Sequence, residues 1–199
     1  MKNAVYIKLP RTGSTTIWNV LEKNNVKYYG GCHMGYWGDS KYNIQTNTSP
    51  HLYECVFNFI GKKIYDESYT FSSVRNPYSR AVSMYTHFSW DSVRTFKEFC
   101  IAIKKGKYPS ECAKWHSSSL TKHITCGDKL MVDYVIRFEN LQEDFNVICD
   151  KIGIPKQELP HKNKTNHKHY TEYYDDETRE IIAEKFAKDI EYFGYEFGE

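Results

Sequence analysis

The segment KLPRTGSTTIW (residues 8–18) combines residue types that can bind an oxyanion. Pro10 suits the end of a strand, and Gly13 allows the main chain to approach a ligand closely. The N–H groups and the positive dipole at the start of a helix bind phosphate, and Arg11 adds a cation with parallel donors. Three hydroxyl residues open the expected helix: Ser14, Thr15 and Thr16.

A nucleoside triphosphate is not the ligand that this segment favours. Loops of the form G-x-x-x-x-G-K-[ST] need a second glycine with a lysine after it. The segment has one glycine, and its arginine stands before that glycine instead of after it. Taken alone, the segment is also compatible with an ordinary turn between a strand and a helix.

A second segment, RNPYSRAVSMY (residues 75–85), has matching chemistry. Arg75 ends an expected strand, and a helix that starts near Pro77 carries Ser83. On that helix Arg80 and Ser83 are expected one turn apart, on adjoining parts of the surface. The sequence therefore predicts a second anion-binding pocket near the first. The alternative for Arg75 is a surface salt bridge.

The elements that must position these segments alternate between strand and helix. Each of three expected strands is followed by an expected helix, indicated by apolar spacing in two cases and by Pro77 in the other. Strands are expected at 4–9, 69–74 and 132–138, and further helices at 52–60, 94–105, 111–120 and 175–194. The alternation predicts a three-layer α/β fold with a mostly parallel sheet flanked by helices. Ligands bind at the carboxyl ends of the strands in such sheets, where both segments begin.

The composition limits the classes of partner. The 199 residues suit a single domain over 1–199, and the net charge of +2 gives no reason to expect nucleic acid or a membrane. No long apolar run is present, so we expect no signal peptide, no membrane span and a cytoplasmic location. The six cysteines form no C-x-x-C pair, and the sequence predicts reduced thiols and no metal site.

Together, the two segments resemble the paired motifs of sulfotransferases that use 3′-phosphoadenosine-5′-phosphosulfate (PAPS). The motifs have the forms P-[KR]-x-G-[ST]-T and R-[ND]-P-x-x-R-x-x-S-x-Y. Segments 137–145 and 161–197 are similar to carbohydrate-type members, in particular the uronosyl 2-O-sulfotransferase branch. The resemblance implies a P-loop-like fold and transfer of the sulfuryl group to an acceptor hydroxyl, with a saccharide favoured and PAP as product. The matched residues are Pro10, Arg11, Gly13, Ser14, Thr15, Arg75, Asn76, Pro77, Arg80, Ser83 and Tyr85.

In that family the first loop holds the 5′-phosphosulfate and the second holds the 3′-phosphate. Most members have lysine where Arg11 stands, bridging the 5′-phosphate and the leaving oxygen, and protein-tyrosine sulfotransferases have arginine there. The resemblance therefore implies a catalytic role for Arg11. It also implies a set of cofactor-binding residues: Arg11, Thr12, Gly13, Ser14, Thr15, Thr16, Arg75 and Ser83, with Asn163, Lys164 and Thr165 in a C-terminal loop.

The acceptor hydroxyl needs a base, and a histidine accepts a proton at neutral pH without much tuning of its pKa. His51 is favoured because Phe57 and Gly61 follow it at the spacing of the uronosyl branch. His33 and Glu54 are the alternatives, and His51 can also be read as a residue that merely opens a helix.

Two other functions stay open at this point. A magnesium-dependent nucleotide kinase of related fold would bind ATP. A non-enzymatic anion-binding module would bind sulfated glycans or nucleic acid through many cations. The histidine-rich stretch 161–169 is interpreted as a basic loop over the cofactor rather than a metal cluster.

Overall fold

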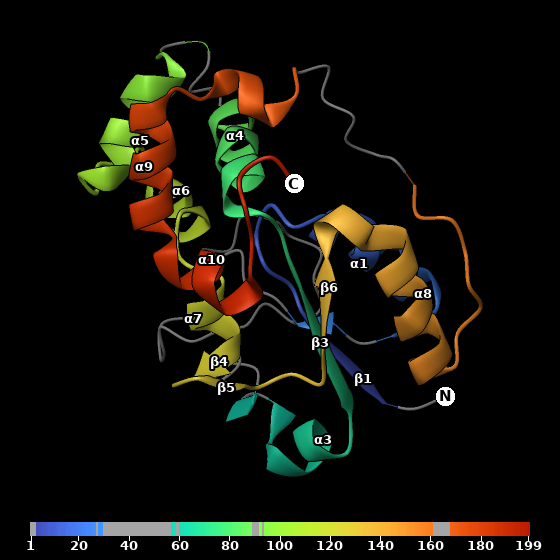
Figure 1. The fold of residues 1–199 in the computed structure, drawn as a ribbon. Helices are drawn as coiled ribbons and strands as arrows, with labels where there is room; N and C mark the ends of the chain where they lie inside the picture. The colour runs from blue at the N-terminus through green and yellow to red at the C-terminus, as the bar shows by residue number, and fades with distance from the viewer. Residues whose placement is uncertain are drawn as a thin grey trace. The chain divides into compact units, whose positions relative to one another are not determined.

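The structure is a computed structural model, and it describes residues 3–26, 28–29, 57–58, 60–88, 92, 94–160 and 168–199. The chain forms two compact units, and each is assembled from two stretches of sequence. The first unit comprises 1–74 and 122–163, and the second comprises 75–121 and 164–199. The four-stranded sheet belongs to the first unit, and the described elements of the second are helices (Figure 1).

The sheet of the first unit is parallel throughout, in the order β2-β1-β3-β6. Its strands are β1 (Ala4–Ile7), β2 (Tyr28–Tyr29), β3 (Tyr69–Val74) and β6 (Tyr134–Arg137). The expected parallel sheet is confirmed; the strand predicted at 69–74 has those bounds, and those at 4–9 and 132–138 are shorter. Because β1 and β3 are parallel neighbours, with Ile7 opposite Ser72, their carboxyl ends lie at one edge of the sheet.

Two helices, α1 (Ser14–Lys23) and α8 (Leu141–Ile152), pack their apolar sides against this sheet (Figure 1). The spacing in the sequence predicts one apolar face on each, and the structure buries both faces in one core. From the helices this core receives Ile17, Val20, Leu21, Phe145, Ile148 and Ile152, and from the strands Ala4, Tyr6, Phe71 and Ile136. The predicted α/β fold with a parallel sheet flanked by helices is confirmed.

Several short elements complete the first unit. They are α3 (Lys62–Asp66), the antiparallel pair β4 (Thr125–Cys126) and β5 (Lys129–Leu130), and the 3-10 helix η3 (Phe138–Asn140). The boundary between the two units falls within the residues of helix α7 (Thr121–Ile124): Thr121 belongs to the second unit and the rest to the first.

The second unit is built from helices around an aromatic core. They are α4 (Pro77–His87), α5 (Phe96–Lys104), α6 (Glu111–His116), the 3-10 helix η4 (Tyr170–Tyr173), α9 (Asp176–Lys185) and α10 (Ala187–Phe193). Helix α9 lies beside α5 and also contacts α4 (Figure 1). None of the described helices is both long and apolar enough to cross a membrane.

The prediction of one continuous helix over 175–194 is wrong. The helix is interrupted at Phe186, whose φ of −116° and ψ of 26° leave the helical range. The Phe186 ring is 1% exposed and packs in the core of the unit, so tertiary packing overrides the helical spacing there. The predicted ends are confirmed, with acidic residues in the first turn of α9 and Gly194 after α10.

Candidate anion-binding site

The loop between β1 and α1 makes a sharp turn over residues 8–13. Arg11 has a φ of 62° and Gly13 a φ of 73°, so two residues of the loop are in the left-handed region. That conformation is uncommon for a residue with a Cβ atom, because it brings Cβ close to the following carbonyl. Arg11 therefore needs neighbouring contacts that hold the turn in this conformation.

Thr12, which lies between those two residues, anchors the loop to the sheet. Its side chain is fully buried, and its Oγ1 donates to the Leu9 carbonyl at 3.0 Å. The same Oγ1 lies 2.7 Å from Oγ of Ser73 on β3, and that Oγ lies 2.7 Å from the Tyr6 hydroxyl on β1. The Thr12 side chain thus faces the protein interior, so a cofactor contact of Thr12 would come from its main chain.

The Arg11 guanidinium is a cation in a partly buried position. Arg11 is half-buried, and this burial lowers the pKa of its guanidinium to about 10. At neutral pH the group keeps its positive charge, but that charge is poorly solvated. An oxyanion beside the guanidinium would offset the desolvation with charge-assisted hydrogen bonds.

The start of α1 leaves its positive end unneutralised by the helix itself. The N-cap is Gly13, which has no side chain to cap the helix, and the first turn has no acidic residue. Helices α5, α6 and α9 differ, since each has a side-chain cap and an acidic first turn. Of the three hydroxyl residues that open α1, Thr15 is exposed, whereas Ser14 and Thr16 are 6% and 8% exposed.

Gly13 also lets α1 pack tightly on the segment that follows β6. A Cβ atom built on Gly13 would lie 3.0 Å from Cδ2 of Phe138 and 3.1 Å from Cδ2 of Leu141. These distances are too short for a relaxed contact, so an alanine there requires its neighbours to move. The stretch 137–145, singled out above by resemblance, is thus in direct contact with the loop.

In the second unit, the predicted helix start at Pro77 is confirmed. Asn76 is the N-cap of α4, and its Oδ1 accepts from the Tyr78 N–H at 3.0 Å. Arg75 donates from Nε and Nη2 to Oγ of Ser79, at 3.0 and 2.7 Å. The Arg75 side chain is therefore held along the first turn of α4, which has no acidic residue.

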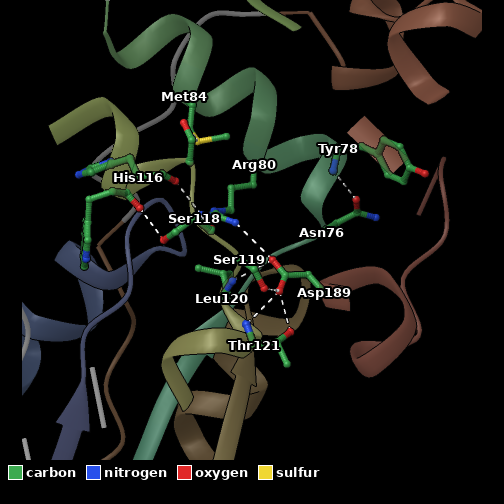
Figure 2. A network of polar contacts seen from close by, with 12 residues as sticks. Asn76, Tyr78, Arg80, Met84, His116, Ser118, Ser119, Leu120, Thr121 and Asp189 are labelled. Atoms are coloured by element: carbon green, nitrogen blue, oxygen red, sulfur yellow. Dashed lines mark hydrogen bonds and ion pairs between the residues drawn. The ribbon is translucent and has the colours of Figure 1, made fainter. Parts of the chain in front are cut away.

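Ser83 lies two turns further along α4 and is 5% exposed. The expectation that Arg80 shares an exposed surface with Ser83 is wrong, because Arg80 is fully buried. Its Nη1 lies 3.5 Å from a carboxylate oxygen of Asp189, and its Nη2 donates to the carbonyls of His116 and Ser118 at 2.7 Å (Figure 2). Because α4 packs its Arg80 side inward, that arginine is a core residue rather than a ligand contact.

Several predicted residues lie outside the described residues: His33, His51, Glu54, Asn163, Lys164 and Thr165. Within the ranges that the structure does describe, no group of three or more histidine, cysteine, aspartate or glutamate side chains could hold a metal ion. The anchoring role of Tyr6 and Ser73 was missed by the sequence reasoning. In the sequence, the signal for this role is that Tyr6 and Ser73 carry hydroxyls within strands that also contain apolar residues.

Comparisons with known proteins identify the family. Over 107 residues the chain is 29% identical to an uncharacterized protein from Archaeoglobus fulgidus. The aligned region covers 51% of this chain and 82% of that protein. The crystal structure of a sulfotransferase from Alicyclobacillus acidocaldarius has a similar fold, with a TM-score of 0.54 and 14% identity over 96% of this chain and 94% of that one. The model of the Sulfotransferase family matches residues 2–196, and the chain therefore belongs to the Sulfotransferase family.

Proposed function

We propose that this protein transfers the sulfuryl group of PAPS to a hydroxyl of an acceptor, with a saccharide as the favoured acceptor class. The observation that carries the proposal is the β1–α1 loop, where a half-buried Arg11 cation precedes a helix start without acidic residues. Membership of the Sulfotransferase family supports sulfuryl transfer by this loop. The saccharide preference rests on the resemblance of 137–145 and 161–197 to carbohydrate-type members.

In this proposal the first loop binds the 5′-phosphosulfate. Arg11 and the first N–H groups of α1 stabilise the negative charge that develops on the leaving phosphate. The acceptor oxygen forms a bond to sulfur while the bond between sulfur and the phosphate oxygen breaks, and PAP leaves. His51 accepts the proton of the acceptor hydroxyl. Gly13, Ser14, Thr15 and Thr16 surround the 5′ group, with Thr12 contributing its main chain.

Arg75 and Ser83 bind the 3′-phosphate in this proposal. The Ser79 hydroxyl already accepts from two donors of Arg75, which orients the guanidinium before a ligand arrives. Asn163, Lys164 and Thr165 contact PAPS from the C-terminal loop. We also infer that both compact units act as one sulfotransferase domain, because the family match spans the two.

Calorimetry of PAP binding in EDTA tests the cofactor. PAP should bind without a metal, and ATP with magnesium should bind far more weakly. Arg75→Ala should weaken PAP binding at least 10-fold, since a charge-assisted contact is worth about 1.5–3 kcal/mol. Tighter binding of ATP with magnesium would support a kinase instead. Unchanged PAP affinity in Arg75→Ala would remove the 3′-phosphate assignment.

Turnover tests the rest of the proposal. Labelled PAPS, offered with saccharide, phenol and tyrosine-peptide acceptors, should label the saccharides most. His51→Ala should lose at least 100-fold in kcat and keep its PAP affinity, because a general base contributes about 10²–10⁴-fold. Full activity of that variant would move the base to another residue. Labelling of peptide or phenol alone would overturn the acceptor class.

A further inference from the structure

The three buried hydroxyls under the first loop form a directional chain. Each hydroxyl has one proton to donate. The Thr12 proton is donated to the Leu9 carbonyl, so Thr12 Oγ1 accepts from Ser73. The Ser73 proton is then committed to Thr12, so Ser73 Oγ accepts from the Tyr6 hydroxyl. The chain therefore runs from Tyr6 through Ser73 and Thr12 to the main chain of the loop.

This chain links two strands of the sheet to the residue between the two left-handed positions. All three side chains are 0% exposed, so water does not compete for their hydrogen bonds. The chain holds the Thr12 side chain against the sheet, and Thr12 lies between Arg11 and Gly13, whose φ angles are both positive. Loss of the link would let the turn relax toward conformations that a non-glycine residue prefers.

We propose that Tyr6, Ser73 and Thr12 are positioning residues that hold the Arg11 turn in its anion-binding conformation. This rests on the proposed function, because the ligand it serves is the 5′-phosphosulfate. The hydroxyl chain itself touches no reacting atom. Its contribution is preorganisation, which improves binding by removing the cost of ordering the loop when the ligand arrives.

Ser72 offers a matched control for Ser73. Both serines are 0% exposed on β3, but the Ser72 hydroxyl donates to the Ile7 carbonyl of β1 at 2.7 Å rather than to a residue of the loop. Ser72→Ala should lose about the stability of one buried hydrogen bond, and Ser73→Ala more, because it removes two and leaves the Tyr6 hydroxyl without its acceptor. Only Ser73→Ala should change the loop.

The first measurement needs no ligand. Hydrogen–deuterium exchange of the peptide that covers residues 8–16 should be faster in Ser73→Ala than in Ser72→Ala. Each variant is measured at the same number of degrees below its own melting temperature. Equal exchange in the two variants would overturn the positioning role, whatever the protein binds.

The second measurement uses PAP and calorimetry. Ser73→Ala and Thr12→Val should weaken PAP binding about 10-fold, the effect of losing one buried hydrogen bond to the loop. Thr12→Ser should restore affinity to within about 2-fold, and Ser72→Ala should stay near wild type. Absence of PAP binding in the wild type would reject the proposed function alone, and failure of Thr12→Ser to restore affinity would reject the positioning role.

Discussion

The molecule fixes its two proposed anion-binding segments by different means. Under the first loop, the hydroxyl chain of Tyr6, Ser73 and Thr12 is neutral. Beside α4, the fully buried Arg80 and Asp189 carry opposite charges (Figure 2). Removal of one link of a neutral buried chain costs about 1–3 kcal/mol of stability, whereas a broken buried ion pair costs about 3–5 kcal/mol, because a charge loses its partner.

The charged network joins separate helices of the second unit. Arg80 on α4 donates to two carbonyls at the end of α6, and Asp189 on α10 accepts from the main-chain N–H groups of Leu120 and Thr121 at 2.9 Å. In the chain around 116–121, carbonyl groups thus contact the Arg80 cation and N–H groups contact the Asp189 carboxylate. This matches the charges that the two ends of a helix prefer. The two networks thus differ in extent: the hydroxyl chain links two strands to one loop, whereas the ion pair links α4, α10 and the chain around 116–121.

The largest effect is expected from Arg80→Met. This change removes the cation that faces the buried Asp189 carboxylate and removes the donor from the carbonyls of His116 and Ser118. The free energy of unfolding in urea should fall by about 3–5 kcal/mol. Arg179→Met is the control, since Arg179 forms a half-exposed pair with Asp176 and should change stability by no more than about 1 kcal/mol. Equal losses would show that burial adds nothing to the Arg80 pair.

Gly13→Ala should have the next largest effect. The alanine would combine a left-handed φ with a Cβ atom 3.0 Å from Phe138, and about 3 kcal/mol of stability should be lost. Gly127→Ala is the control, because Gly127 has a φ of 59° but no atom within 4 Å of an added Cβ. Its loss should be only about 1–2 kcal/mol in urea unfolding. A smaller loss at Gly13 than at Gly127 would contradict tight packing of α1 on Phe138.

Sequence reasoning worked where local chemistry decides the structure. The parallel strands, the start of α4 at Pro77 and the apolar faces of α1 and α8 follow from spacing and capping. The sequence could not reveal that Arg80 is a core residue. An arginine one turn from Ser83 has the same local pattern whether it meets solvent or a carboxylate more than 100 residues away.

The same limit explains the other differences. The break at Phe186 follows from tertiary packing, which helical spacing does not contain. The link between Tyr6 and Ser73 joins residues 67 positions apart, and only strand register brings them together. Short motifs identify the residues of the candidate site, whereas the hydroxyls that contact the loop from the sheet meet through pairings distant in the sequence.

A smaller effect is expected at Asn76, the N-cap of α4 in the charged region. Besides capping the helix, its Nδ2 donates to the Glu196 carbonyl at 2.7 Å, so Asn76→Ala removes two buried contacts. The loss should be about 2 kcal/mol in urea unfolding. Ser110→Ala removes only the cap of α6 and should cost about 1 kcal/mol. Equal losses would mean that the Glu196 contact contributes no stability.

The smallest effect is expected from Tyr6 of the hydroxyl chain, and it concerns how the free energy of unfolding depends on pH. Burial raises the pKa of Tyr6 well above its usual value, although the neighbouring hydroxyls of Ser73 and Thr12 lower the pKa in part. The unfolded phenol ionises near pH 10, whereas the folded one keeps its proton. Tyr6 therefore contributes stability that is complete below that pH and is lost as the pH rises above it.

The free energy of unfolding should accordingly decrease less between about pH 9 and about pH 10.5 in Tyr6→Phe than in the wild type. At about pH 10 the decrease should be smaller by roughly 0.4 kcal/mol. Urea unfolding across this range measures the slope. Ser73→Ala keeps the buried phenol and should keep the slope of the wild type. An unchanged slope in Tyr6→Phe would show that Tyr6 ionises alike in the folded and unfolded chain, which its burial under the loop does not allow.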